Sequence, residues 1–178
     1  MAVAEDDDAW AYTEAMEVLS AAGYEHYEVS NFARPGWRSR HNWGYWHGAP
    51  YLGVGLGAHS FIDGVRWWNV RNLRKYLQAM ASGTSPCAGR EVLTAAQARA
   101  EQIWLRLRTC EGVRLSAWER ERLQRQPRFG QLIEAGLLCL EGDCLRLTRA
   151  GMPLADALGV EVVRLREAPA PPAVAERR

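Results

Sequence analysis

Apolar side chains recur at helical spacing near the start of the chain, over residues 8–22, and Gly23 follows as a stop signal. Residues 24–29, with the sequence YEHYEV, have the short alternating pattern of a strand. The apolar positions of the first helix are Tyr12, Ala15, Met16, Leu19 and Ala22. Because a helix here leads directly into a strand, the pattern predicts α/β construction.

Residues 51–62, with the sequence YLGVGLGAHSFI, carry glycine at positions 53, 55 and 57. If this run is an extended strand, glycine at every second position leaves one face of the strand without side chains. A bare strand face admits a flat ligand or another backbone, and close packing against a neighbouring helix is the alternative. Gly53, Gly55 and Ala58 also fit the spacing of a dinucleotide fingerprint, but the expected hairpin after them excludes that motif, which requires a helix there.

The middle of the chain alternates turn signals with short periodic segments. Residues 30–36 read as a loop, and Asp63-Gly64 between apolar runs predicts a β-hairpin over residues 61–70. A helix is expected over residues 73–80, closed near Gly83. Residues 82–90, with the sequence SGTSPCAGR, are the clearest predicted linker.

The second half of the chain reads as mainly helical. Thr94 with Gln97 and Ser116 with Glu119 are capping boxes, so each predicts a helix start. Further elements are expected as a helix over 129–136, a hairpin of 137–140 with 144–147, and a helix over 149–158. Helices followed by a hairpin resemble a winged helix. The predicted domains are therefore residues 1–86, residues 87–166 with the helical winged-helix-like pattern, and a disordered Pro/Ala-rich tail, 167–178.

Composition narrows the function classes. The formal net charge is +1, and the candidate recognition helix at 129–136 lacks lysine and arginine, so a nucleic-acid partner is not expected. No apolar run approaches the ~20 residues that a membrane span requires. The acidic start of the chain does not resemble a signal peptide, and the cysteines, at 87, 110, 139 and 144, read as reduced thiols. A cytoplasmic location is the expectation.

His41 is the candidate metal ligand. Five of the eight tryptophans lie between residues 37 and 68, so His41 stands in an aromatic-rich segment. A neutral imidazole among such rings suits the axial position of haem iron, whereas a hydrogen-bonded histidine in an aromatic core is the alternative. His47 and His59 lie nearby in sequence but match no multi-ligand spacing, and His26 reads as structural. Glu28 at a strand end is a lone carboxylate and weak support for acid–base chemistry.

Several motifs follow one another along residues 6–163. They are YEHYEVSNFARPG at 24–36, SRHNWGYW at 39–46, YLGVGLGAHS at 51–60, LRTCEGV at 107–113, and LIEAGLL followed by LRLT and a glycine within 132–151. In this order they resemble one known family, the oxygen-independent coproporphyrinogen III oxidase-like radical SAM proteins. The His-Asn-x-x-Tyr-Trp form of the second motif points to the haem-chaperone branch of that family, called HemW.

The resemblance implies a fold and a ligand. It implies an α/β protein with an incomplete (β/α) barrel segment and a β-hairpin, followed by a mainly helical domain. It also implies haem or porphyrin and haemoprotein acceptors as partners. By the same resemblance His41 is the haem-iron ligand, with Asn42, Tyr45 and Trp46 around the haem, and Gly55, Gly57 and Ala58 lie on the S-adenosylmethionine side. In an extended strand Ala58 would lie on the face opposite the three glycines. The face without side chains and the S-adenosylmethionine contact that the family implies at Ala58 therefore do not coincide.

One departure from the family limits the expected chemistry. The Cys-x-x-x-Cys-x-x-Cys triplet that holds a 4Fe-4S cluster does not occur in this sequence. S-adenosylmethionine and the 4Fe-4S cluster are therefore expected only in full-length relatives, and catalysis by this chain alone is not expected. The leading hypothesis is haem binding and delivery by a C-terminal half. The alternative is the C-terminal part of an oxidase-like radical SAM enzyme of porphyrin biosynthesis, acting with a separate N-terminal half.

Overall fold

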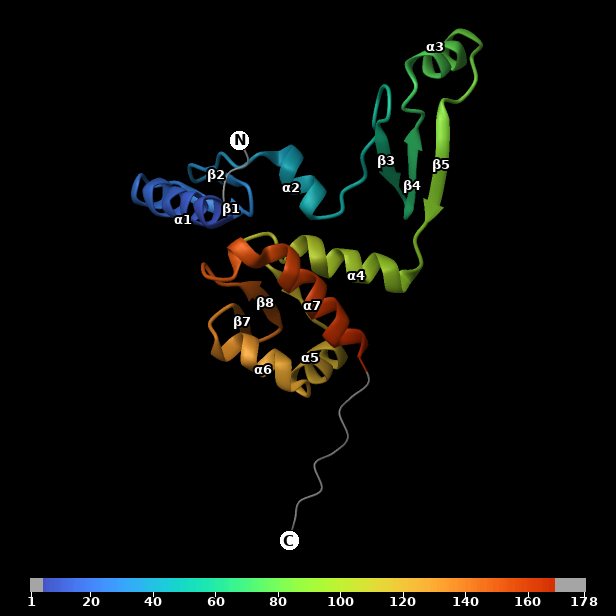
Figure 1. Cartoon of the computed structure of the whole chain (residues 1–178). Coiled ribbons are helices and arrows are strands. Elements are labelled where there is room, and N and C mark those ends of the chain that lie inside the picture. The colour runs from blue at the N-terminus through green and yellow to red at the C-terminus, as the bar shows by residue number, and fades with distance from the viewer. Residues whose placement is uncertain (1–4, 169–178) are drawn as a thin grey trace.

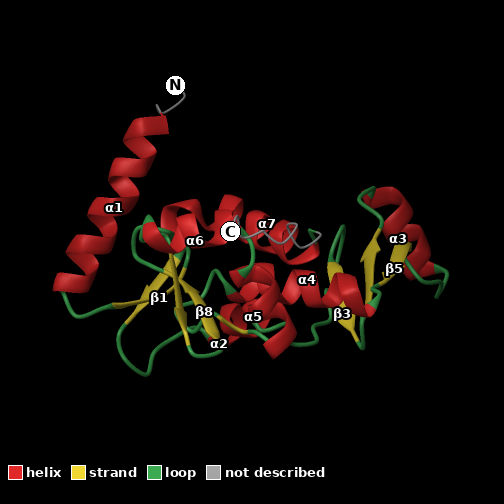
Figure 2. Cartoon of the chain, turned by 90° about the horizontal axis from the view of Figure 1, so that it is seen from below, coloured by secondary structure: helices red, strands yellow, loops and turns green. Residues whose placement is uncertain are grey.

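The structure is a computed structural model that describes residues 5–168. Figure 1 shows a helical unit with a small sheet, an N-terminal segment beside it, and an arm of strands that projects away with a helix at its far end. Figure 2, seen from below, shows the same separation of the arm from the rest of the chain. The expected tail lies outside the described residues except for its first two positions, 167 and 168.

The N-terminal segment confirms the predicted helix and strand. Helix α1 (Glu5–Ala21) leads into β1 (Glu25–Glu28), which pairs antiparallel with β2 (Asn31–Ala33). The expectation of a loop over residues 30–36 is therefore wrong for 31–33. The reason is local: the buried Glu28 carboxylate accepts from the Ser30 backbone N–H at 3.0 Å and from the Asn31 side chain, which closes a tight turn between the strands.

The projecting arm contains the predicted hairpin. Strands β3 (His59–Ile62) and β4 (Val65–Asn69) pair antiparallel through the Asp63-Gly64 turn, whose residues have φ of 51° and 76°. Both φ values are positive, as a two-residue hairpin of this type requires. Helix α3 (Leu73–Ala81) follows as expected and lies at the far end of the arm (Figure 1).

The second part of the predicted linker, residues 87–90, lies in a strand, whereas residues 82–86 lie in none. Residues Cys87–Val92 form β5, which pairs antiparallel with β4 and completes a three-stranded sheet. The linker prediction was wrong there because its small residues serve close contact: a Cβ on Gly89 would lie 2.6 Å from the Trp68 ring. A domain boundary after residue 86 would divide this sheet, so the division into 1–86 and 87–166 stays a prediction that the pairing does not favour.

The glycine run is not an extended strand, which corrects the bare-face prediction. Tyr51 pairs with Phe61 in a bridge, the chain then turns through residues 52–58, and the end of the run, His59–Ile62, is strand β3. Gly55 and Gly57 have φ of 107° and 66°, which other residues rarely adopt. Gly53 instead meets backbone: a Cβ there would lie 2.0 Å from the His59 carbonyl oxygen. The glycines thus permit turning and close backbone approach.

The C-terminal unit confirms the predicted helix starts. Both capping boxes are formed, Thr94 with Gln97 and Ser116 with Glu119. The last helix begins and ends later than expected, since residues 149–151 are a turn before a short 3-10 helix. The elements are α4 (Ala95–Arg106), β6 (Val113–Arg114), α5 (Ala117–Gln124), α6 (Pro127–Glu134), β7 (Leu138–Glu141), β8 (Cys144–Leu147), η1 (Met152–Leu154) and α7 (Ala155–Glu167).

The hydrophobic core lies mostly in this C-terminal unit. Helix α4 packs against α7, and the sheet has the order β6-β8-β7. Fully buried apolar side chains such as Ile103, Leu123, Leu145 and Val162 meet there, and removing their surface from water is the main stabilising term. Met16 of α1 joins the same cluster, so the N-terminal helix is anchored to this unit.

The observed class is a mixture of helices and antiparallel sheets. Every strand pairing within residues 5–168 is antiparallel, whereas the strands of a (β/α) barrel pair in parallel. The incomplete barrel segment and the winged-helix assignment stay predictions. Within the described part of the chain, each helix is too short or too polar to cross a membrane.

Candidate functional site

The His-Asn-x-x-Tyr-Trp stretch forms a short helix, α2 (Arg40–Trp46). Ser39 is its N-cap, and the Ser39 hydroxyl accepts from the Asn42 backbone N–H at 3.3 Å. His41 and Tyr45 lie one turn apart on one helix face, with ring centroids 4.7 Å apart and an interplanar angle of 86°. The helix therefore places an imidazole edge-on against a phenol ring.

His41 is exposed, so it is not a core histidine. Its ring lies at a small depression of about 170 Å³ that is also lined by Arg40, Tyr45 and Tyr51. Among the described residues, neither ring nitrogen of His41 makes a hydrogen bond; its contact is with the Tyr45 ring. Arg40 is exposed too and forms no ion pair with residues 10–168, whose side chains the structure describes. An imidazole and a guanidinium are thus both available at this depression.

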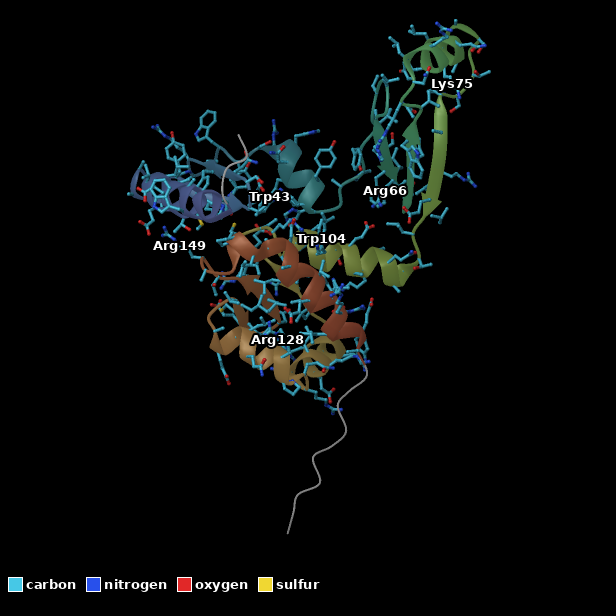
Figure 3. The ribbon with its side chains drawn as sticks, in the orientation of Figure 1. Trp43, Arg66, Lys75, Trp104, Arg128 and Arg149 are labelled. Carbon is cyan, nitrogen blue, oxygen red and sulfur yellow. The ribbon has the colours of Figure 1, made fainter. Side chains whose placement is uncertain are left out.

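A larger groove of about 910 Å³ lies on the other side of Tyr45. It runs between α2, the β3–β4 hairpin and α4, and Figure 3 shows Arg66 of the hairpin and Trp104 of α4 on either side of this region. Tyr45 and Trp46 line the groove, and Tyr45 also lines the depression at His41. Asn42 lines neither. The aromatic residues at the groove are Tyr45, Trp46, His47, Tyr51, His59, Phe61 and Trp104.

The two histidines at the groove, His47 and His59, differ in their hydrogen bonding. His47 is held in place, because Nδ1 lies 2.8 Å from the Trp43 carbonyl oxygen and Nε2 lies 3.4 Å from the Glu111 carboxylate. His59 is exposed, stacks on Trp68 with centroids 5.9 Å apart, and makes no ring hydrogen bond in the described part of the chain. Sequence reasoning placed neither at a site. His47 caps the end of α2, and only the folded hairpin brings His59 to the same groove.

Trp104 forms a rigid wall of the groove. The buried Arg108 guanidinium lies 3.2 Å from the Trp104 ring centroid and donates to the Trp104 carbonyl at 2.6 Å and to Asp156. Burial lowers the pKa of Arg108, although the Asp156 carboxylate opposes that effect. A Cβ on Gly159 would lie 2.7 Å from the Trp104 indole, so the backbone of α7 packs closely against this ring. The position of Trp104 is thus set before any ligand arrives.

Gly55, Gly57 and Ala58 do not meet the His41 site. Asn69 pins their loop: its side-chain amide donates to the Gly55 carbonyl at 2.8 Å, and its backbone N–H donates to the Ala58 carbonyl at 2.9 Å. Neither the groove nor the depression is lined by any of the three. The structure therefore brings together His41, Tyr45 and, across the helix, Trp46, and leaves the glycine loop apart.

His26 and Glu28 belong to the packing of α1 on the first strands. The Tyr12 hydroxyl donates to the Val29 carbonyl at 2.6 Å, and His26 stacks on Phe32 at 4.2 Å. Burial lowers the pKa of His26, and burial together with the Glu28 charge raises the pKa of Tyr12 to about 12. The side chains of Tyr12, His26 and Glu28 bond to or pack against neighbouring groups, which is typical of a structural cluster.

Known proteins resemble the chain in both sequence and fold. Residues 93–154 match the HemN C-terminal domain family. Heme chaperone HemW of Mycobacterium tuberculosis is 44% identical over 160 residues, which cover 87% of this chain and 40% of that protein. A mitochondrial radical S-adenosyl methionine domain-containing protein 1 from Bos taurus is 35% identical, over 88% of this chain and 39% of its own length.

A solved structure shows the same fold. The coproporphyrinogen III oxidase HemN from Escherichia coli, a radical SAM enzyme, superposes with a TM-score of 0.61 at 18% identity, over 86% of this chain and 39% of that one. The chain thus spans about 40% of the length of these relatives.

Proposed function

Because the chain belongs to the HemN and HemW family, in which it corresponds to the C-terminal part, we propose that it binds haem through His41 and passes it to haemoproteins. The observation that carries the proposal is the exposed His41 imidazole. It stands on the His-Asn-x-x-Tyr-Trp helix without a hydrogen bond among the described residues, and the Tyr45 ring lies against it at 4.7 Å.

The residues at the depression fit the chemistry of haem. A neutral imidazole nitrogen is a common axial ligand of haem iron. The Arg40 guanidinium, which has no ion-pair partner among residues 10–168, would donate charge-assisted hydrogen bonds to a haem carboxylate. Tyr45 and Tyr51 supply aromatic contact at the same place. In this role haem is the cargo, held at His41 by its iron and at Arg40 by its carboxylate.

The small volume of the depression supports delivery over permanent storage. A volume of about 170 Å³ lies below the ~300–1,000 Å³ of pockets that enclose a small molecule. A haem ligated there keeps most of its surface accessible to a second protein, which is what a transfer step requires. Acceptor haemoproteins are therefore the proposed partners.

The test is a titration of the purified chain with haem, followed in the Soret region. Wild type is expected to give an iron–histidine spectrum, and His41→Ala to lose it. Free imidazole added to His41→Ala is expected to restore the spectrum, because it replaces the missing ligand without changing the fold. An unaltered spectrum in His41→Ala would remove the assignment.

A second candidate is a part of a coproporphyrinogen III oxidase-like enzyme, supported by the match of residues 93–154 to the HemN C-terminal domain. Its S-adenosylmethionine and 4Fe-4S cluster would have to be held by a separate N-terminal half, since the cysteines here lack the ligand spacing. Gly55, Gly57 and Ala58 would then face that half. Oxidase activity that requires both this chain and a cluster-bearing polypeptide would support this candidate; haem binding without such activity would argue against it.

A further inference from the structure

We propose that the groove beside α2 is a second tetrapyrrole site, in which His59 ligates the iron and the aromatic walls hold the macrocycle. The inference rests on the proposed haem binding, because it takes the same ligand class. It concerns different residues, however, and predicts a second equivalent of ligand for each chain.

The size and lining of the groove suit a large flat molecule. Its volume of about 910 Å³ lies near the upper end of the range of ligand pockets. Rings line it from different elements: Trp46 from α2, Tyr51 and Phe61 from the hairpin side, and Trp104 from α4. Aromatic side chains bind flat ligands by stacking and edge contacts while they bury much apolar surface.

The imidazole of His59 gives the groove its metal-binding group. Of the two histidines at the groove, His47 already has both ring nitrogens near acceptors, whereas His59 has none within the described residues. His59 is exposed and is supported from one side by the Trp68 ring. An imidazole whose nitrogens are free to bind iron, beside aromatic walls, favours an iron porphyrin over a simple apolar ligand.

The polar residues of the groove do not oppose this ligand. Arg66 is paired with Glu101 at 2.6 Å, so the carboxylate of Glu101 at the groove wall already has a cationic partner. Arg99 is bonded to Glu119 and also lines the groove. Gln102 remains as a neutral donor at the wall.

Tyr45 connects the two sites. It lines both the depression at His41 and the groove, and a row of rings continues from it: Tyr45 to Tyr51 at 4.6 Å and Tyr51 to Phe61 at 6.4 Å. A haem released from His41 would therefore have an aromatic surface leading to His59, and the groove would act as the second position in a transfer.

The test combines variants of the ligands with a variant that fills the groove. Ala98 lines the groove on the exposed face of α4, so Ala98→Trp would fill the space without disturbing the core. Ala96→Trp, on the same helix but away from the groove, is the matched control. The probes are haem and metal-free protoporphyrin, followed by absorbance and by quenching of tryptophan fluorescence.

Wild type is expected to bind two equivalents of haem. His59→Ala and Ala98→Trp should each remove the same equivalent, while His41→Ala removes the other and Ala96→Trp removes none. Metal-free protoporphyrin should bind weakly, and Ala98→Trp should abolish its binding. Loss of an equivalent in His59→Ala but not in His41→Ala would support the groove and refute the proposed function. A single equivalent that depends on His41 alone would overturn the groove and leave the proposed function standing, and no haem binding at all would overturn both.

Discussion

The Arg66 guanidinium of β4 lies 2.6 Å from the Glu101 carboxylate of α4, and this ion pair joins the projecting arm to the helical unit at the edge of the groove. Both side chains of the pair are partly exposed. We expect this ion pair to fix the position of the arm relative to α4 and the groove.

Glu101→Gln is expected to loosen the arm with little effect on global stability. A partly exposed ion pair contributes about 0.2–1 kcal/mol to the free energy of unfolding. Faster hydrogen exchange should appear at the amides of β4 and β5, while the denaturation midpoint shifts only slightly. Glu91→Gln, which removes the longer 3.5 Å contact of Arg66, is the control and should change exchange less. A large fall in global stability would contradict this role.

Glu119 is expected to make stability depend on pH. Burial alone would raise the pKa of Glu119, but hydrogen bonds from Arg99, the Ser116 backbone N–H and Arg166 lower it to about 2, from an ordinary value of 4.5. Because the folded pKa is the lower one, the stabilisation is complete above the unfolded pKa and is lost as the pH falls toward 2.

The corresponding variant is Glu119→Gln, which leaves two guanidinium groups without their carboxylate. Removing one partner of a buried ion pair costs about 3 kcal/mol, measured as the free energy of unfolding at neutral pH. The difference from wild type should shrink as the pH is lowered from 5 toward 2, by the ~1.4 kcal/mol that each pH unit carries. Glu121→Gln, whose partner Arg125 is an exposed i,i+4 neighbour, should change stability by less than about 0.5 kcal/mol at any pH.

Arg40→Gln is expected to weaken haem binding only by removing the contact between Arg40 and a haem carboxylate. If Arg40 pairs with a haem carboxylate, the variant should lose about tenfold in affinity, because a charge-assisted hydrogen bond contributes about 1.5 kcal/mol. Haem whose carboxylates are esterified should bind wild type and Arg40→Gln equally. His41→Ala should weaken both ligands, and Arg74→Gln, on α3 at the far end of the arm, serves as the control. Equal losses for both ligands in Arg40→Gln would contradict the pairing.

Gly53→Ala is expected to destabilise the loop before the hairpin. An added Cβ would lie 2.0 Å from the His59 carbonyl oxygen, and because that neighbour is backbone, the chain itself has to shift. The cost should be about 2 kcal/mol, seen as a lower denaturation midpoint. Gly130→Ala is the matched control, since no atom lies within 4 Å of its Cβ position in α6, and it should stabilise by about 0.5–1 kcal/mol. Equal effects of the two substitutions would refute the close-approach argument.

The sequence patterns for helix caps and tight turns predicted the structure correctly, because these features depend on only a few neighbouring residues. The capping boxes at Thr94 and Ser116 need only a hydroxyl and a side chain three residues later, and both form as predicted. The Asp63-Gly64 turn needs only residues that tolerate positive φ. The linker prediction failed because the strand at 87–92 depends on a partner, β4, that lies some twenty residues earlier in the chain.

The candidate site, too, has features that the sequence predicts and features that depend on the tertiary structure. The amino-acid sequence by itself determined that His41 and Tyr45 share a motif and, through the family resemblance, which ligand to expect. Only the tertiary structure decided that Tyr45 stands between two cavities, that His47 is locked to Glu111 while His59 is available, and that Gly55 and Gly57 turn the chain. The physical reason is range: caps, turns and helix faces are set by neighbours along the chain, whereas a groove exists only where segments distant in sequence are packed against each other.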